Sequence, residues 1–144
     1  MAKVSEHFKI EELVPEYIFK RYGASAQTFL DPRMIQAAEW LRTEMGVPMI
    51  CNDWNIGGHF QNRGFRLPDS TVGATLSQHK FGRALDLSSP KVSCQEMYDF
   101  VMANQVEALA HNLTTMEDIR DTKTWLHISC QWNPIQDKIL IIRP

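Results

Sequence analysis

The chain has 144 residues, of which 44% are hydrophobic and 22% are charged, and its formal net charge is -2. A chain of this length can bury a core large enough for one stable domain, so we expect a single domain over residues 1–144. The small negative net charge gives the chain no overall basic field, and nucleic acid is therefore not expected as the main partner.

The cysteines and the N-terminal residues indicate where the chain folds. Cys51, Cys94 and Cys130 are odd in number and widely spaced, which fits neither a disulfide framework nor a CxxC zinc site. The first residues, MAKVSEHFKIEELVPEY, carry charges throughout, and no later segment approaches the length of a membrane span. We expect reduced thiols, synthesis and folding in the cytoplasm, and no stable association with a membrane.

The clearest predicted helix covers residues 31–46, DPRMIQAAEWLRTEMG. Asp31 is a favourable N-cap, Pro32 suits the first helical position, and Gly46 ends the pattern. The residues of the expected core-facing stripe are apolar and recur at helical spacing: Met34, Ala38, Leu41 and Met45.

A second helix and several strands follow from similar signals. Ser93 and Glu96 form a capping-box pattern at the start of a helix over residues 93–105. Short runs rich in β-branched and aromatic residues predict strands at VPMICN, RALDLS, WLHISC and KILIIR. Residues 53–75, with several glycines and aromatic residues, predict a long ordered loop. The fold class is therefore α+β.

The segment SQHKFGRALD and the strand WLHISC contain a possible metal site. A catalytic zinc ion typically has three nitrogen or oxygen ligands from the protein and one open position. His79 and Asp86 can face the same side if Gly82 bends the chain before the strand, and His127 can join them if its strand pairs beside Asp86. Each residue taken alone is more simply a structural or solvent-exposed residue, and it is their combination that favours the metal.

Ser77, His79, Gly82, Ala84 and Asp86 resemble the S-x-H-x-x-G-x-A-x-D pattern of the zinc D-alanyl-D-alanine carboxypeptidases and related phage endolysin peptidases, which share the Hedgehog fold. WLHIS resembles the strand that supplies the last ligand in this family, and RGFR resembles its aromatic-arginine element. The resemblance covers most of the chain. It implies one domain with a small antiparallel sheet packed with helices.

The resemblance also implies roles for individual residues. It places Zn²⁺ on His79, Asp86 and His127, and it implies that Arg66 polarises the scissile carbonyl or stabilises the developing oxyanion. Arg63 is a nearby competitor for this role and a possible substrate contact. Ser77 would contact substrate or support a ligand, although a turn-forming serine would look the same.

The general base is where the sequence departs from the family. Members commonly carry a glutamate shortly before the last histidine, but Thr124 stands three positions before His127. Asp121, six positions before His127, is the slightly favoured candidate for its spacing, and Glu117 and Asp118 are alternatives. A solvated, charged turn would account for each of these carboxylates equally well.

The resemblance predicts a zinc peptidase that cleaves peptidoglycan peptides next to a D-amino acid. Because no export signal or wall-binding module is recognised, a phage or prophage lysis enzyme, or a virion component, is expected rather than a secreted housekeeping carboxypeptidase. The competing hypothesis is a non-catalytic module of the same fold that binds metal or wall fragments. The bond cleaved, the identity of the metal and the oligomeric state do not follow from the sequence.

Overall fold

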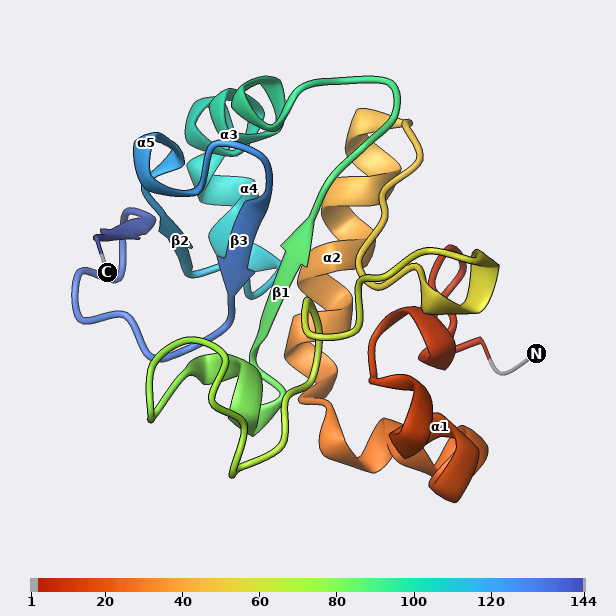
Figure 1. The fold of residues 1–144 in the computed structure, drawn as a ribbon. Coiled ribbons are helices and arrows are strands. Elements are labelled where there is room, and N and C mark those ends of the chain that lie inside the picture. Colours follow the sequence, from red (N-terminus) through yellow and green to blue (C-terminus); the bar gives the residue numbers. More distant parts are fainter. Residues whose placement is uncertain (1–2, 144) are drawn as a thin grey trace.

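A four-stranded sheet with strand order β1-β3-β2-β4 forms the centre of the computed structural model, which describes residues 3–143 (Figure 1). The strands are β1 (Ala84–Leu87), β2 (Thr115–Glu117), β3 (Leu126–Ser129) and β4 (Leu140–Ile142). β3 pairs antiparallel with both β1 and β2, whereas β4 pairs parallel with β2. The sheet is therefore mixed and not antiparallel throughout, because the loop 130–139 carries the chain past β2 before β4 pairs on its far side.

The helices confirm both helical predictions and add several that the sequence did not signal. The α-helices are α1 (Glu16–Tyr22), α2 (Pro32–Met45), α3 (Cys94–Ala103), α4 (Gln105–Ala110) and α5 (Ile119–Thr122). Short 3-10 helices are η1 (Ile10–Glu12), η2 (Gly23–Phe29), η3 (Trp54–Ile56) and η4 (Gln78–Phe81). The Asp31 side chain caps α2 by accepting a hydrogen bond from the backbone N–H of Arg33, and Ser93 caps α3 in the same way through Glu96.

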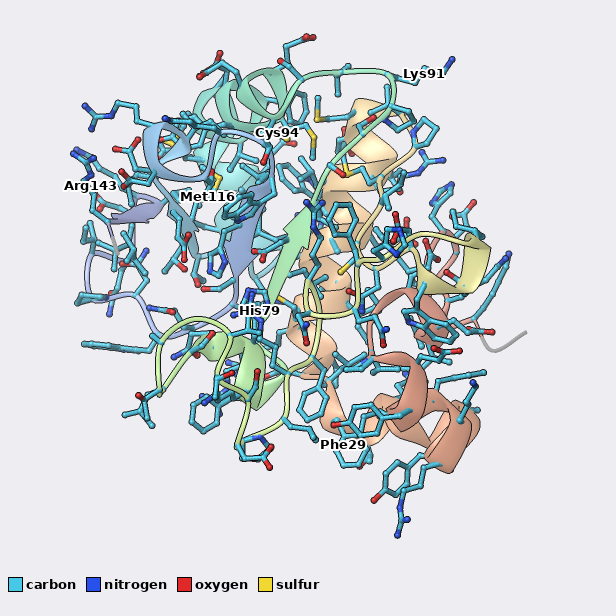
Figure 2. The ribbon with its side chains drawn as sticks, viewed as in Figure 1. Phe29, His79, Lys91, Cys94, Met116 and Arg143 are labelled. Carbon is cyan, nitrogen blue, oxygen red and sulfur yellow. The ribbon has the colours of Figure 1, made fainter. Side chains whose placement is uncertain are left out.

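The two faces of the sheet have different chemistry because side chains alternate along each strand. One face is apolar and fully buried, and it consists of Leu85, Leu87, Met116, Leu126 and Ile128. Helices α2 and α3 contact this part of the sheet, and Figure 1 shows α2 behind β1. The side chains in Figure 2 include Met116, which lies in this core. The opposite face carries Asp86 and His127.

Residues 47–52 do not form the predicted strand. Only Ile50 makes an isolated bridge to Ser88. Pro48 has no N–H to donate to a ladder, and the backbone N–H of Asn52 donates to the Glu12 carbonyl oxygen at 2.9 Å. The backbone of this segment thus forms hydrogen bonds with Ser88, just after β1, and with Glu12 in the N-terminal region.

Residues 53–75 form the expected long loop, with η3 as its one regular element among the described residues. The loop is fixed to the N-terminal region, because the Trp54 indole N–H donates to the Val14 carbonyl oxygen at 2.9 Å and the Phe65 N–H donates to that of Leu13 at 2.8 Å. Trp54 is therefore an anchor of the loop. Its second half, after Phe65, runs beside the polar face of the sheet.

The cysteines and the helices of residues 3–143 each have one further property. The three cysteines are free and buried, as expected for reduced thiols. None of the helices in this part of the chain combines the length and apolar character needed to cross a bilayer.

Candidate metal centre

The pairing of β1 with β3 places Asp86 directly opposite His127. Oδ1 of Asp86 lies 2.9 Å from Nδ1 of His127, and both side chains are more than nine-tenths buried. Strand pairing thus brings together two residues that are 41 positions apart in the sequence. The expectation that the strand of His127 lies beside Asp86 is confirmed.

His79 reaches the same carboxylate from η4, which precedes β1. Its Nε2 lies 3.3 Å from Oδ1 of Asp86, and its ring is 2% exposed. Gly82 ends η4 with φ of 68°, and a Cβ at this position would overlap the carbonyl oxygen of Phe29. The predicted bend at Gly82 therefore exists, and its backbone geometry and close packing both favour glycine.

A second hydrogen bond fixes the orientation of the His79 ring. Nδ1 of His79 lies 2.8 Å from the carbonyl oxygen of Gly64. A carbonyl can only accept, so Nδ1 carries a proton, and Nε2 is the ring nitrogen that faces Asp86. Backbone carbonyls commonly orient metal-binding histidines in this way. Gly64 itself is packed so closely against Leu13 that a Cβ would overlap the Leu13 carbonyl oxygen.

One ligand atom from each of His79, Asp86 and His127 lies within 4.8 Å of the other two. Zinc–nitrogen and zinc–oxygen bonds of about 2 Å in tetrahedral geometry place ligand atoms roughly 3.3 Å apart. The observed contacts of 2.9 and 3.3 Å are close to this separation. The group could therefore hold a metal ion with small side-chain movements, and a two-histidine, one-carboxylate set suits several divalent metals besides zinc.

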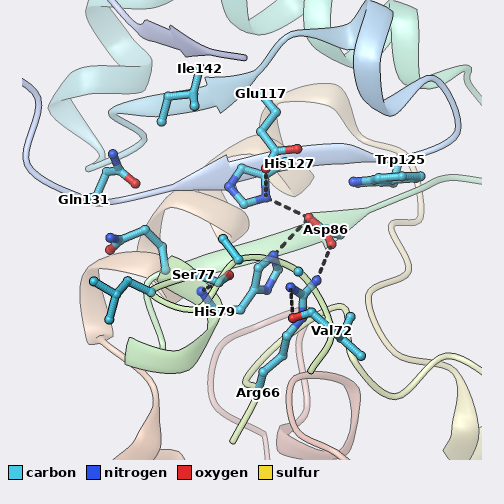
Figure 3. Close-up of a pocket in the computed structure, with 14 residues that line it drawn as sticks. Arg66, Val72, Ser77, His79, Asp86, Glu117, Trp125, His127, Gln131 and Ile142 are labelled. Atoms are coloured by element: carbon cyan, nitrogen blue, oxygen red, sulfur yellow. Dashed lines mark hydrogen bonds and ion pairs between the residues drawn. The ribbon is translucent and has the colours of Figure 1, made fainter. Parts of the chain in front are cut away.

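Arg66 faces the same carboxylate from the other side (Figure 3). Its Nη2 lies 3.3 Å from Oδ2 of Asp86, while Nε donates to the Asn62 carbonyl oxygen at 2.7 Å. Burial alone would raise the pKa of Asp86, but hydrogen bonds from His127 and His79 outweigh it and hold the pKa well below its usual range. Burial lowers the pKa of Arg66, and the nearby Asp86 charge opposes that shift. Asp86 is therefore a carboxylate, ready to bind a cation.

The cluster lies in a cavity of about 530 Å³ on the polar face of the sheet. Glu117, at the end of β2, also lines the cavity, and its Oε1 is 3.7 Å from Nδ1 of His127. The side chain of Glu117 is 24% exposed, so solvent reaches it. Figure 3 shows Glu117 above His127 and Asp86, with Arg66 on the other side of the cluster. Glu117 is the candidate base that the fold brings to the cluster.

Asp121 and Asp118 lie outside the cavity. Arg143 donates to both carboxylate oxygens of Asp121 at 3.0 and 2.7 Å, and Figure 2 shows Arg143 at the outer edge of the molecule, far from His79. Asp118 caps α5 and pairs with Arg120 at 2.6 Å. Sequence spacing slightly favours Asp121 over Glu117 as the base, but Glu117 is the carboxylate that lies beside the cluster. Asp121 lies outside the cavity because α5 turns the chain away from the sheet after Glu117.

The other residues considered as substrate contacts differ in whether they line the cavity. Ser77 lines the cavity, but its hydroxyl accepts a hydrogen bond from the backbone N–H of His79 at 3.3 Å and caps η4. Arg63 does not line the cavity, since its guanidinium stacks 3.6 Å from the ring centroid of Phe60 and donates to Ser88. Trp125 lines the cavity at the start of β3.

Several lining residues carried no signal in the sequence. They are Val72, Gly73, Ala74 and Leu76 from the loop, and Gln131 and Ile142 from the ends of β3 and β4. Ile142 could have been assigned to this face only by knowing that it pairs with Glu117. The backbone hydrogen bond from Arg66 N–H to the His79 carbonyl oxygen holds the start of this loop segment beside the His79–Asp86–His127 cluster.

Comparison of the chain with protein-family models, curated proteins and solved structures gives no significant match.

Proposed function

We propose that the protein is a zinc-dependent peptidase that cleaves peptidoglycan peptides next to a D-amino acid. The observation that carries the proposal is the buried His79–Asp86–His127 cluster in an open cavity, with a further carboxylate, that of Glu117, beside it. The resemblance of SQHKFGRALD and WLHIS to the zinc carboxypeptidases and phage endolysin peptidases supplies the substrate class.

A zinc ion held by these residues would lower the pKa of a water molecule and polarise a carbonyl group. Glu117 would accept a proton from the attacking water at its carboxylate and pass it to the leaving amine nitrogen; its Oε1 lies 3.7 Å from Nδ1 of His127, which supports this role. The Arg66 guanidinium would stabilise negative charge on the carbonyl oxygen. Of its five N–H donors, three are engaged by Asn62, Val72 and Asp86, which leaves two for a substrate.

The cavity also suits the size and polarity of a short peptide. Its walls combine apolar side chains, among them Val72, Leu76 and Ile142, with the charged cluster at its base. Ligand sites typically combine an apolar wall with a few polar groups that fix orientation. Action on the bacterial cell wall, as by a phage or prophage lysis enzyme, belongs to the same proposal.

The alternative function is a non-catalytic module that binds metal or wall fragments, for instance in a virion. One observation favours it: Asp86 already has partners in His127, His79 and Arg66, so the cluster is complete as a buried ion-pair network. Such networks occur for structural reasons as well as at active sites.

The test is hydrolysis of defined stem peptides that contain D-amino acids, followed by mass spectrometry. The zinc-loaded protein should produce one new amine and one new carboxylate terminus, and His79→Ala should produce none. His59→Ala, which changes an exposed histidine outside the cavity, is the matched control and should retain the activity. A zinc-loaded wild type that releases no product from any wall peptide would replace the peptidase with the non-catalytic module.

A further inference from the structure

A second cavity, of about 460 Å³, lies beyond the C-terminal end of β3. Its lining includes two arginines, several amide side chains and one aromatic side chain, among them Arg33, Arg83, Asn112, Gln131, Trp132 and Gln136. Gln131 also lines the first cavity, so the two hollows are adjacent. None of the proposed peptidase roles uses this second cavity.

Trp132 is the most conspicuous residue of this cavity because its side chain is 78% exposed. A single exposed apolar residue is ordinary on a protein surface, but an indole beside a hollow offers a flat apolar face to a ligand. Tryptophan is also among the residues most enriched at binding interfaces. The faces of sugar rings, which carry C–H groups, pack well on such a surface.

The backbone on both sides of Trp132 is fixed. The Gln131 carbonyl oxygen accepts a hydrogen bond from the Thr114 hydroxyl at 2.6 Å. Asn133 is 7% exposed, and its side-chain amide donates to the carbonyl oxygens of Thr114 and Lys138 at 2.9 and 2.7 Å. The backbone position of Trp132 is therefore set before any ligand binds, which lowers the entropic cost of binding.

The polar groups around Trp132 favour a neutral, hydroxyl-rich ligand over a polyanion. Arg33 is held in a bidentate pair with Asp31 at 3.1 and 2.7 Å, and Arg83 lies 3.7 Å from the same carboxylate. One negative charge thus offsets much of the field of the two arginines. Among the described residues 3–143, the side-chain amide of Gln131 has no hydrogen-bond partner within the protein, so it remains free to bind a ligand.

The geometry of β3 connects the two cavities. Trp125 lies just before the strand and Gln131 just after it, and both line the first cavity. A strand rises about 3.3 Å per residue, so these six positions span roughly 20 Å. A ligand that follows β3 past Gln131 arrives at Trp132 (Figure 3 shows Gln131 and Trp125 on either side of His127). The surface suits a substrate with one part in each cavity.

We propose that the second cavity binds the sugar chain of peptidoglycan, an oligomer of N-acetylated amino sugars, while the attached peptide enters the cavity of His79, Asp86 and His127. One sugar ring packs on the Trp132 indole, and Gln131 bonds its hydroxyl or acetamido groups. The position of the peptide rests on the peptidase function proposed above. The binding of sugar at Trp132 does not require catalysis.

Two measurements test this proposal separately. The first is titration of the full chain with a peptide-free oligomer of N-acetylglucosamine, followed by tryptophan fluorescence and calorimetry. Trp132→Ala should weaken binding about tenfold, the size typical of truncating an aromatic anchor, and Trp132→Phe should restore part of the affinity. Val106→Ala, at an equally exposed apolar position on α4, should bind like the wild type.

The second measurement compares cleavage of a free stem peptide with cleavage of the same peptide attached to sugar. Trp132→Ala should lower kcat/KM about tenfold for the sugar-linked substrate only. Equal loss on both substrates, no binding of the oligomer by the wild type, or preferential binding of inorganic polyphosphate would overturn the sugar site. If the wild type cleaves neither substrate but binds the oligomer through Trp132, the peptidase function fails and the sugar site stands.

Discussion

Oδ1 of Asp86 accepts a hydrogen bond from Nδ1 of His127 at 2.9 Å across the β1–β3 pair. The side-chain period of a strand is two residues, so a slip of this register by one position would turn one of these residues toward the apolar core. The register is held in place by the neighbouring core pairs, Leu85 with Ile128 and Leu87 with Leu126. Hydrophobic packing on one face of the sheet thus sets the geometry of the charged cluster on the other.

The first prediction is the metal content of the purified protein. The wild type should bind about one zinc ion per chain, as expected for three converging protein ligands, and His79→Ala should lose most of it because the remaining two ligands are too few. Elemental analysis after dialysis measures the content. His59→Ala is the control and should retain the ion. Equal zinc in the wild type and in His79→Ala would remove His79 from the site.

The second prediction concerns metal removal and stability. A ligand that binds only the folded state stabilises it by about 2.7 kcal/mol when its free concentration is a hundredfold above Kd. For a chain of this size that corresponds to roughly 5–10 °C in Tm. Chelation should lower the Tm measured by calorimetry, and zinc should restore it. His79→Ala provides the control, since its Tm should not respond to zinc; an unchanged Tm in a wild type that can be reloaded would contradict the prediction.

The His79–Asp86–His127 cluster could be proposed from the sequence because each of its two segments carries a local signal, although the β1–β3 pairing that joins the segments is not local. His79 and Asp86 lie within one short segment, where Gly82 signals the bend, and alternation along WLHISC places His127 on the polar face. The two main helices were predictable for a similar reason, since their caps at Asp31 and Ser93 are local signals.

The candidate base could not be chosen in this way because its position depends on a non-local pairing. Strand β2 has only three residues, too few for a clear alternation, and Glu117 reaches His127 only because β2 pairs with β3. Asp121 has a plausible spacing, but α5 intervenes and directs it toward Arg143. The parallel pairing of β4 with β2 could not be predicted from the sequence either, because it depends on the path of the loop 130–139.

A third prediction tests the cap of α2, the longest helix. The hydrogen bonds from Arg33 are the main cause of a pKa of Asp31 below its ordinary value. The stabilisation is therefore present above the unfolded pKa, near 3.9, and is lost as the pH falls through the lower pKa of the folded state. Asp31→Ala should cost about 1 kcal/mol at neutral pH.

Asp31→Asn separates the cap from the charge. Asparagine also caps helices well, so this variant should lose less stability than Asp31→Ala at pH 7. It should also show a weaker decline than the wild type does as the pH falls below about 4. Chemical unfolding at several pH values measures both effects. Identical pH profiles in the wild type and Asp31→Asn would show that the ion pairs with Arg33 and Arg83 contribute nothing.

The last prediction distinguishes the two candidate bases. Glu117→Gln should lower turnover of wall peptides by roughly a hundredfold to ten-thousandfold, the usual contribution of a positioned proton acceptor. The substitution preserves size and hydrogen bonding, and Glu117 is not one of the three metal ligands, so zinc content should stay near that of the wild type. Steady-state kinetics and elemental analysis on the same preparations give both values.

Asp121→Asn is the matched control for the loss of a carboxylate. Its side chain lies outside the cavity and pairs with Arg143, so turnover should stay near the wild-type rate while the surface ion pair is lost. An exposed pair of this kind contributes at most about 1 kcal/mol, so the fold should persist. If Asp121→Asn is inactive and Glu117→Gln is fully active, the base does not act from the position that β2 gives Glu117. Helix α5, which carries Asp121, would then have to move toward the His79–Asp86–His127 cluster during catalysis.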